Sequence, residues 1–202
     1  FGSLGVLGQT VKTHGGSGTS NLAYGLVAYE FEKIDSSYRS SISVQSSLVI
    51  HPINEFGSQE QKDKYLPSLI KGEKIGCFGL TESEAGSDPA SMKTSFKKTK
   101  DGYILNGSKN WITNAPIADI FIIWAIEENK DHKSIKGFII EKNTEGLNTS
   151  TIENKTSLKI SPTGQIILNN VFVPSNLCLE NTEGWKSVFS CLNKARFGIS
   201  WG

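Results

Sequence analysis

The sequence predicts an α+β fold in which a helical part comes first, a β-rich part follows, and a further helix begins at the end. Three observations carry this prediction. Apolar residues recur at helical spacing through the first part, alternate or form short runs through the middle, and return to helical spacing near the C-terminus. We therefore divide the chain into residues 1–72, 73–181 and 182–202, and expect functional sites to lie between these parts.

The first part contains two segments with the signatures of complete helices. Residues 21–34 carry apolar side chains at helical spacing after Ser20, a residue suited to the N-cap. Further along, Ser58 and Gln61 have the spacing of a capping box, and Gly72 is placed to end that helix. These signals predict helices with defined ends.

The stretch YRSSISVQSSLVIHPI, residues 38–53, lies between these helices and is rich in serine. Serine is a mediocre helix former, because its hydroxyl competes for backbone hydrogen bonds. A helix here would place Arg39, Ser43 and Ser47 on one side. A face that is polar but nearly uncharged suits the wall of a ligand cavity, so we expect one here.

The middle part contains four runs typical of strands, GYILNG, DIFIIWAI, GFIIEK and QIILNNVFV. Two dipeptides, Asp101-Gly102 and Asn106-Gly107, are strong signals for tight turns. We therefore expect a β-sandwich or a β-barrel that turns at both dipeptides.

The last part, EGWKSVFSCLNKARFGISWG, has the spacing of one helix. The chain begins at Phe1 without a methionine and stops inside this expected helix. We therefore expect it to be an internal piece of a longer protein.

Charge and composition exclude several classes of function. The 21 basic and 20 acidic residues give a net charge of +1, which provides no electrostatic footprint for nucleic acid or an anionic membrane. No apolar stretch approaches the roughly 20 residues of a membrane helix, and no signal or transit segment is visible. Cys77, Cys178 and Cys191 lack metal-binding spacing, so we expect free thiols that fill apolar space in a reducing compartment.

The stretch CFGLTESEAGSD, residues 77–88, gathers acidic groups, hydroxyls and glycines where the helical part meets the strands. A metal site is disfavoured, because the three histidines are remote in sequence: His14, His51 and His132. A general acid–base site is disfavoured too, because we expect this loop to be solvated. Its candidate carboxylates would be Glu82, Glu84 and Asp88.

A contact with an anion or a cofactor is the better chemical interpretation of this loop. Gly79 and Gly86 have no side chain, and the hydroxyls of Thr81 and Ser87 are small, so backbone N–H groups could approach a ligand closely. On this stretch alone, a plain polar turn remains the alternative.

The stretch KNWITNAP, residues 109–116, places a tryptophan between small polar residues at the end of a strand. Trp111 could fill the core, as tryptophans usually do. It could also be a stacking platform for a flat aromatic ligand, with the hydroxyl of Thr113 offered to a ring heteroatom.

Together, LTESEAGSD and NGSKNWITNAP resemble the paired flavin-binding signatures of the acyl-CoA dehydrogenase family. The resemblance continues through FEKIDSSYRSSISVQSSLVIHPI, GSQEQKDKYLPSLIKGEKIGCFGL and CLNKARFGISWG, so it spans essentially the whole chain. These stretches look most like the glutaryl-CoA dehydrogenases of that family. The resemblance implies an N-terminal helical domain, a middle β domain, and the first helix of a C-terminal helical domain.

The resemblance also implies FAD as cofactor, bound between the middle and C-terminal domains. Carried over to this sequence, the flavin contacts are Phe78, Leu80, Thr81, Gly86, Ser87, Trp111, Ile112 and Thr113. Thr81 would bond the pyrimidine side of the flavin, where fixed donors stabilise the negative charge of the reduced ring. Thr113 would lie near the hydride-accepting nitrogen.

The substrate contacts that the resemblance implies are Arg39, Ser40, Ser43, Ser87, Phe189, Asn193 and Arg196. Only two of the 21 basic residues are arginines, Arg39 and Arg196, which suggests a need for planar, forked donation. Arg39 could hold the distal carboxylate of a dicarboxylyl thioester. A surface or salt-bridged arginine is the alternative at both positions.

Three further positions qualify the resemblance. Glu32 matches the glutamate that accompanies the substrate arginine, although we favour an ordinary exposed acid at a helix end. Ser83 stands where glutaryl-type members usually have proline, which leaves the loop freer. The family's catalytic base is a glutamate of the C-terminal domain, so we assign no catalytic residue within these 202 residues.

For the longer protein, the resemblance implies flavin-dependent α,β-dehydrogenation of an acyl-CoA, with oxidative decarboxylation of glutaryl-CoA to crotonyl-CoA. Electrons would pass to an electron-transferring flavoprotein. A short-chain monocarboxylic acyl-CoA and an acyl-CoA oxidase reaction are alternatives, and a truncated binding-only module is a third. A homotetramer is implied, located in the mitochondrial matrix of a eukaryote or the cytoplasm of a bacterium, with a role in lysine and tryptophan degradation or fatty acid metabolism.

Overall fold

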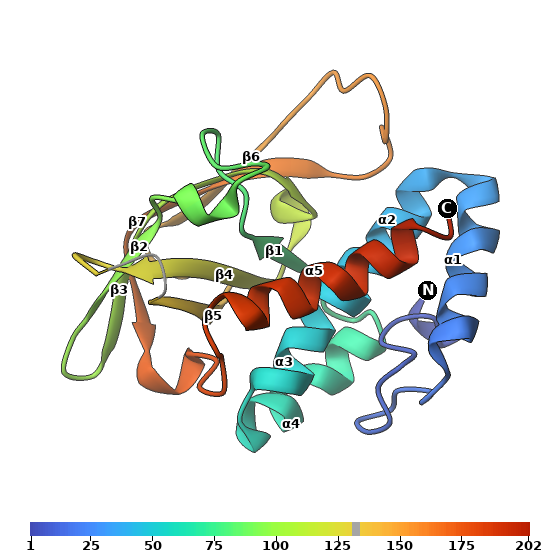
Figure 1. The fold of residues 1–202 in the computed structure, drawn as a ribbon, viewed down its shortest axis with the longest axis horizontal. Coiled ribbons are helices and arrows are strands. Elements are labelled where there is room, and N and C mark those ends of the chain that lie inside the picture. Colours follow the sequence, from blue (N-terminus) through green and yellow to red (C-terminus); the bar gives the residue numbers. More distant parts are fainter. Residues whose placement is uncertain (131–133) are drawn as a thin grey trace.

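The computed structural model describes residues 1–130 and 134–202, so His132 lies outside the described residues. Helices gather at one end of the molecule and the strands at the other, and α5 (Trp185–Ile199) runs between the two ends (Figure 1). Both chain termini lie at the helical end. Among the described helices, none combines the length and the apolar character that a membrane crossing requires.

The helical end is built from segments that begin and end where local signals predict. The helices are α1 (Asn21–Ile34), α2 (Ser36–Ser43), the π-helical segment η2 (Val44–Ile50), α3 (His51–Phe56) and α4 (Gln59–Ile70). The side chain of Ser20 accepts a hydrogen bond from the amide of Ala23 at the start of α1. Both bonds of the Ser58–Gln61 capping box are present, and Gly72 follows α4 with φ +70°. These predictions are confirmed.

The serine-rich stretch is helical. Ser41 lines a cavity of about 240 Å³, whereas the hydroxyls of Ser46 and of Ser47, which is on the face we expected to line a cavity, make packing contacts. Ser47 is fully buried, and its hydroxyl lies 3.0 Å from the hydroxyl of Tyr24 on α1. The hydroxyl of Ser46 accepts a hydrogen bond from the amide of Gly8. The π-helical segment η2 departs from the 3.6-residue period on which the expected common face of Arg39 and Ser47 depended. Small hydroxyls therefore serve here as contacts between packed segments.

Seven strands form the other end of the molecule: β1 (Gly76–Gly79), β2 (Ser95–Lys98), β3 (Gly102–Thr113), β4 (Ile120–Glu127), β5 (Ile135–Glu141), β6 (Leu147–Thr151) and β7 (Thr163–Pro174). They form one sheet in the order β1-β4-β2-β3-β7-β6, and β5 also pairs with β4. The pairings of β4 with β1 and with β2 are parallel, and the other pairings are antiparallel. Short 3₁₀ turns complete the chain at Gly2–Leu4, Pro89–Ser91, Ala115–Ile117 and Ser175–Leu177.

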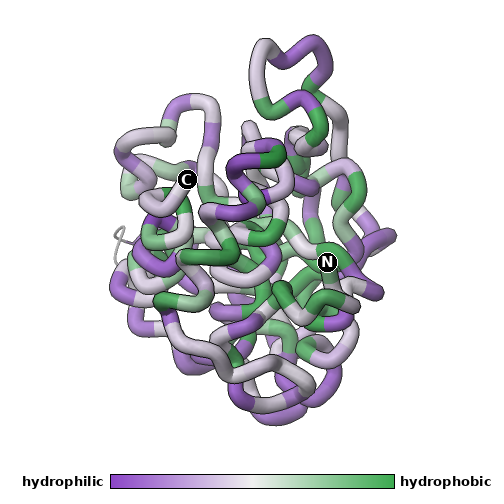
Figure 2. The backbone as a smooth tube through the Cα atoms, turned by 90° about the vertical axis from the view of Figure 1, so that its right-hand side faces the viewer, coloured by the Kyte–Doolittle hydropathy of each residue, from purple (hydrophilic) through white to green (hydrophobic). Residues whose placement is uncertain are grey.

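Two apolar clusters hold the molecule together. One joins the helical end to the sheet and includes Val49, Leu66 and Trp124. The other belongs to the β part and includes Phe96 and Phe138. Figure 2 shows that apolar colours concentrate in the body of the molecule, whereas the loop between β6 and β7 projects from it with mixed character. The order of helices, strands and helix confirms the predicted α+β class.

The two expected turns have different outcomes. Asp101-Gly102 closes the β2–β3 hairpin, where the amide of Thr99 donates to the carbonyl of Gly102 at 2.8 Å. Asn106-Gly107 instead lies inside β3, at a register shift opposite β7, so the turn expected there is wrong. Gly107 has φ +145°, and a Cβ at this position would lie 2.5 Å from the hydroxyl of Thr94. The glycine therefore allows a close approach inside β3, opposite an extra residue of β7, and it does not reverse the chain.

Candidate functional site

The loop that follows β1 forms a tight turn at the junction of the two ends. Glu82 and Ala85 exchange two backbone hydrogen bonds of 3.2 Å, which close the turn. Gly86 is exposed, and a Cβ built on it would meet no atom within 4 Å. Asp88 accepts a hydrogen bond from the amide of Ala90, so it caps a 3₁₀ turn. The outer part of this loop is thus open to a ligand.

Most of this loop is exposed as expected, but Glu82 is an exception, because only 8% of the residue is exposed. Its carboxylate accepts hydrogen bonds from the amides of Lys93 at 2.7 Å and Thr94 at 2.9 Å, and from Nζ of Lys109 at 2.9 Å. Burial alone would raise the pKa of Glu82, but the ammonium of Lys109 and these donors outweigh it and hold the pKa below its usual 4.5. Glu82 is therefore an internal ion-pair partner.

Lys109 is a site residue that sequence reasoning missed. Its side chain is fully buried, and Nζ also donates to the carbonyl of Leu80 at 3.0 Å. Burial lowers its pKa to about 8, against the opposite effect of Glu82. The sequence did contain a signal for this burial. Side chains alternate between the two faces of a strand, and Lys109 is four residues from the buried Leu105, so both point to the same face. A lysine at such a position requires an internal partner.

Trp111 does not fill the core, so that interpretation is wrong. It is 59% exposed and has φ +59°, in the left-handed region. Between Lys109 and Ile112 the register with β7 shifts, so that two residues of β3 stand opposite one. Such a bulge turns a side chain out of the sheet face. The indole is therefore presented at the surface, beside the loop that follows β1.

Asn110 ties this bulge to the loop. Its amide donates to the carbonyl of Thr81 at 2.9 Å, and its Oδ1 accepts from the amide of Trp111 at 3.0 Å. Its Nδ2 donates to the hydroxyl of Ser83 at 3.2 Å. At Ser83, where the resemblance led us to expect a freer loop, this side-chain contact restrains the turn.

A cavity of about 160 Å³ opens between the loop, β3 and the helices. Six of the eight expected flavin contacts line it: Phe78, Leu80, Thr81, Trp111, Ile112 and Thr113. Gly86 and Ser87 are not in its lining and lie on the exposed part of the loop. Its walls are apolar except for two threonine hydroxyls, which suits a flat aromatic group with a polar edge.

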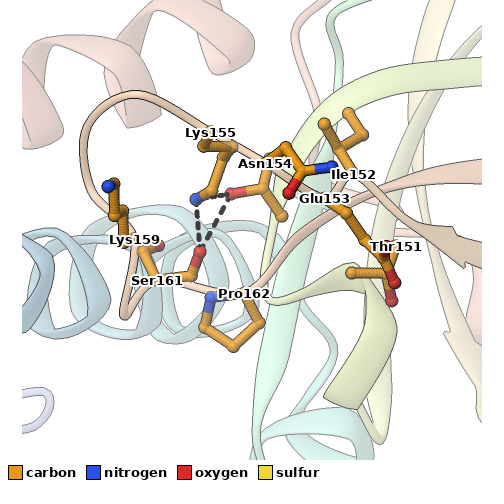
Figure 3. Close-up of a pocket in the computed structure, with 9 residues that line it drawn as sticks. Thr151, Ile152, Glu153, Asn154, Lys155, Lys159, Ser161 and Pro162 are labelled. Atoms are coloured by element: carbon orange, nitrogen blue, oxygen red, sulfur yellow. Dashed lines mark hydrogen bonds between the residues drawn. The ribbon is translucent and has the colours of Figure 1, made fainter.

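The loop between β6 and β7 extends this surface. Trp111 and Thr113 also line an open depression of about 440 Å³ whose other wall is residues 152–158. Figure 3 shows Lys155 held within the loop, where Nζ donates to the carbonyl of Ser161 and to the hydroxyl of Thr163 at 2.7 Å. This partly buried lysine links the two sides of the loop, and no sequence signal had assigned it a role.

Arg39 and Glu32 form a second ion pair on the helical side. Nε of Arg39 donates to Oε2 of Glu32 at 2.7 Å, and the hydroxyl of Ser36 donates to Oε1. The hydrogen bond from Ser36 is the main cause of the lowered pKa of Glu32. Glu32 is thus not the ordinary exposed acid that we favoured, and the salt-bridged alternative for Arg39 is observed. The bond found for Arg39 leaves its terminal Nη groups available to a further acceptor.

The other expected substrate contacts are not gathered in the 160 Å³ cavity. Ser43 is buried and Ser40 is partly buried on α2, while Phe189 is 41% exposed on α5. Nη1 of Arg196, also exposed, donates to the side chain of Asn193 at 3.2 Å. Of the residues of α5, Leu192 is the one that lines the cavity.

The thiols and histidines take structural positions. Cys77, Cys178 and Cys191 are free and buried, and burial raises the pKa of each. His14 pairs with Asp63, and His51 with Ser190. Within residues 1–130 and 134–202, no group of three or more His, Cys, Asp or Glu side chains is arranged to hold a metal ion.

Comparisons with known proteins agree with this geometry. The family model "Acyl-CoA dehydrogenase, N-terminal domain" matches residues 1–73, and "Acyl-CoA dehydrogenase, middle domain" matches residues 77–171. An acyl-CoA dehydrogenase of Bacillus subtilis is 38% identical, and a short-chain-specific acyl-CoA dehydrogenase of Clostridium acetobutylicum is 37% identical, each over 99% of this chain and 54% of the relative. The chain therefore spans about half the length of these relatives.

A solved structure gives the same result for the fold. The glutaryl-CoA dehydrogenase of Mycobacterium smegmatis in complex with FADH2 is similar over 100% of this chain and 51% of that one, with a TM-score of 0.96 and 44% sequence identity. The predicted arrangement of N-terminal helices, middle β domain and a starting C-terminal helix is confirmed by this match.

Proposed function

The chain belongs to the acyl-CoA dehydrogenase family, and from this premise we propose that the protein containing it is an FAD-dependent dehydrogenase that acts on glutaryl-CoA. The observation that carries the flavin part of the proposal is Trp111. An exposed indole in a left-handed backbone conformation, beside an apolar cavity, is a costly arrangement that serves no packing purpose. It fits a ligand with a flat aromatic face.

The residues around the cavity match the chemistry of FAD. When bound, FAD supplies an acceptor for the hydride that leaves the β-carbon of the acyl group. The hydroxyls of Thr81 and Thr113 would donate to the polar edge of the ring, which stabilises negative charge without reorganisation. Phe78, Leu80 and Ile112 would exclude water from the remaining edge. Gly86 and Ser87 would contact the polar extension of the cofactor from the exposed part of the loop.

The choice of glutaryl-CoA depends on Arg39. Its Nη groups could bind the distal carboxylate of the substrate through two parallel hydrogen bonds, while Glu32 orients the guanidinium through Nε. The resulting reaction would remove the α-proton and would transfer the β-hydrogen as hydride to FAD. The carboxylate on the γ-carbon would then leave as CO₂, and the γ-carbon would take up a proton to give crotonyl-CoA. The base for the α-proton is assigned to no residue of this chain.

A short-chain monocarboxylic acyl-CoA is the second candidate substrate, favoured by the 37% identity to a short-chain-specific relative. We further propose an electron-transferring flavoprotein as electron acceptor and a homotetrameric assembly, in the mitochondrial matrix or the bacterial cytoplasm. The Arg39–Glu32 pair is our reason to prefer a dicarboxylyl substrate, because a monocarboxylic acyl chain offers no anion for Arg39.

Arg39→Ala in the full gene product tests the substrate. We expect kcat/KM for glutaryl-CoA to fall by about 100-fold, because a charged group of the substrate loses its partner, while kcat/KM for butyryl-CoA falls less than about threefold. The matched control is Arg196→Ala, which removes the other arginine and should affect both substrates alike. Equal losses for both substrates in Arg39→Ala would reject the carboxylate-binding role. A gene product that purifies colourless and fails to take up FAD would reject the flavin part.

A further inference from the structure

Two consecutive residues of β3 form hydrogen bonds with four consecutive residues, 80–83, of the loop that follows β1. Nζ of Lys109 donates to Leu80 and Glu82, and Asn110 donates to Thr81 through its amide and to Ser83 through Nδ2. We call this set of contacts the 109–110 clamp. It joins the two segments that carry Thr81 and Trp111, which are 30 positions apart in the sequence.

Stability alone does not account for the buried charges of the clamp. Moving an ammonium and a carboxylate out of water is costly, and apolar residues of similar size at such positions are often as stable or more stable. Lys109 is 0% exposed and Glu82 8% exposed, so both charges bear this desolvation. What an ion pair provides, and an apolar pair does not, is a fixed direction for each hydrogen bond.

The backbone at Trp111 needs such fixing. A bulky residue with φ +59° is strained, and strain of this kind persists only where the surroundings impose it. Here two contacts impose it. Asn110 Oδ1 accepts a hydrogen bond from the amide of Trp111, and the buried side chain of Lys109 holds β3 two residues earlier through its bond to the carbonyl of Leu80. Without them the bulge could relax, and the indole would leave its position opposite Thr81.

We propose that Lys109, Glu82 and Asn110 are positioning residues that set the placement of Trp111 relative to Thr81 before the flavin binds. The inference rests on the proposed function, because it concerns the flavin site. These side chains act through the loop carbonyls and the bulge, and not through contact with the cofactor. Loss of their hydrogen bonds should therefore lower the affinity for FAD even in variants that remain folded.

Asn110 offers the cleanest test, because it is partly exposed and its replacement leaves the core intact. In the full gene product, Asn110→Ala removes the acceptor for the Trp111 amide, whereas Asn110→Asp keeps it. We expect Asn110→Ala to raise the Kd for FAD by about tenfold, and Asn110→Asp to remain within about threefold of the wild type. Fluorescence titration gives the Kd, and thermal melting of the apoprotein should show little change.

Lys109→Met/Glu82→Gln tests the ion pair. It removes both charges, so the fold does not retain an unpaired buried charge. The single glutamine oxygen keeps the hydrogen bond to one of the two amides, Lys93 or Thr94, that now donate to separate oxygens of Glu82. We expect a similar rise in the Kd for FAD. The control is Lys130→Met, which removes an ion pair with Glu127 whose lysine side chain is 59% exposed. It should leave the Kd unchanged.

Hydrogen exchange of the ligand-free protein separates this inference from the proposed function. In Asn110→Ala, amides of residues 109–113 should exchange at least about tenfold faster than in the wild type. If wild-type protein binds no FAD, the proposed function fails, and the exchange rates still decide whether the clamp holds Trp111. The positioning role would be overturned by unchanged exchange rates, or by unchanged Kd values in variants that fold. It would also be overturned if Asn110→Asp bound FAD as weakly as Asn110→Ala.

Discussion

Two of the ion pairs among the described residues, Lys109–Glu82 and Arg39–Glu32, are chemically similar and differ in what surrounds them. Lys109–Glu82 spans 2.9 Å with side chains 0% and 9% exposed, and Arg39–Glu32 spans 2.7 Å with side chains 14% and 22% exposed. Lys109 also donates to the carbonyl of Leu80, and Glu82 also accepts hydrogen bonds from the amides of Lys93 and Thr94. In the other pair, the bond that Arg39 makes uses Nε and leaves its terminal groups available.

The comparison shows that distance alone does not assign a role to an ion pair. A pair whose donors and acceptors are engaged inside the protein fixes the backbone around it, because neither partner can exchange without leaving a buried charge. A pair with unused donors at a partly open position can accept a second anion at small cost. This difference is our reason for proposing a positioning role for Lys109–Glu82 and a ligand-binding role for Arg39–Glu32.

The largest expected difference between the pairs is in stability. Lys109→Met leaves Glu82 without its counter-charge in the interior, and should lower the free energy of unfolding by about 3–5 kcal/mol. Arg39→Met, at a partly exposed pair, should lower it by less than about 1 kcal/mol. Urea denaturation of the full gene product measures both. Equal losses in the two variants would remove the distinction that we draw between the pairs.

A change at Trp111 separates function from stability. Trp111→Asn should weaken FAD binding by about tenfold, because the stacking surface is lost. Its free energy of unfolding should stay within about 1 kcal/mol of the wild type, because asparagine tolerates the left-handed conformation. Ile167→Asn is the control, since it removes an exposed apolar side chain from β7. A large loss of stability in Trp111→Asn would indicate a packing role for the indole.

The smallest expected effect is the acid dependence of stability. The pKa of Glu82 and that of Glu32 both lie below the usual 4.5 in the folded protein. Each carboxylate therefore contributes stability that is present above about pH 4.5 and is lost as the pH falls through its lowered pKa. Thermal midpoints between pH 3 and pH 7 should fall less steeply in Glu82→Gln than in the wild type. Glu32→Gln should flatten the curve less than Glu82→Gln, because the Arg39–Glu32 pair is partly exposed and contributes less. Parallel curves for all three proteins would contradict this.

Local signals in the sequence determined the ends of the helices and the overall class. Ser20 and the Ser58–Gln61 pair act on amides within three residues, so their effect does not depend on the rest of the fold. The alternation of apolar residues likewise predicted a β-rich middle part. The family resemblance, carried by contiguous motifs, identified six residues that the structure gathers around one cavity.

Tertiary structure alone decided which polar residues are interior and how they are paired. Glu82 looked solvated because its loop is polar, yet Lys109, 27 positions away, makes its burial possible. Asn106-Gly107 has the composition of a turn, but it lies inside β3, where it faces an extra residue of β7 and approaches Thr94 closely. The physical reason is that caps and periodicity depend on neighbours along the chain, whereas burying a charge or straining a backbone depends on partners that only folding brings into contact.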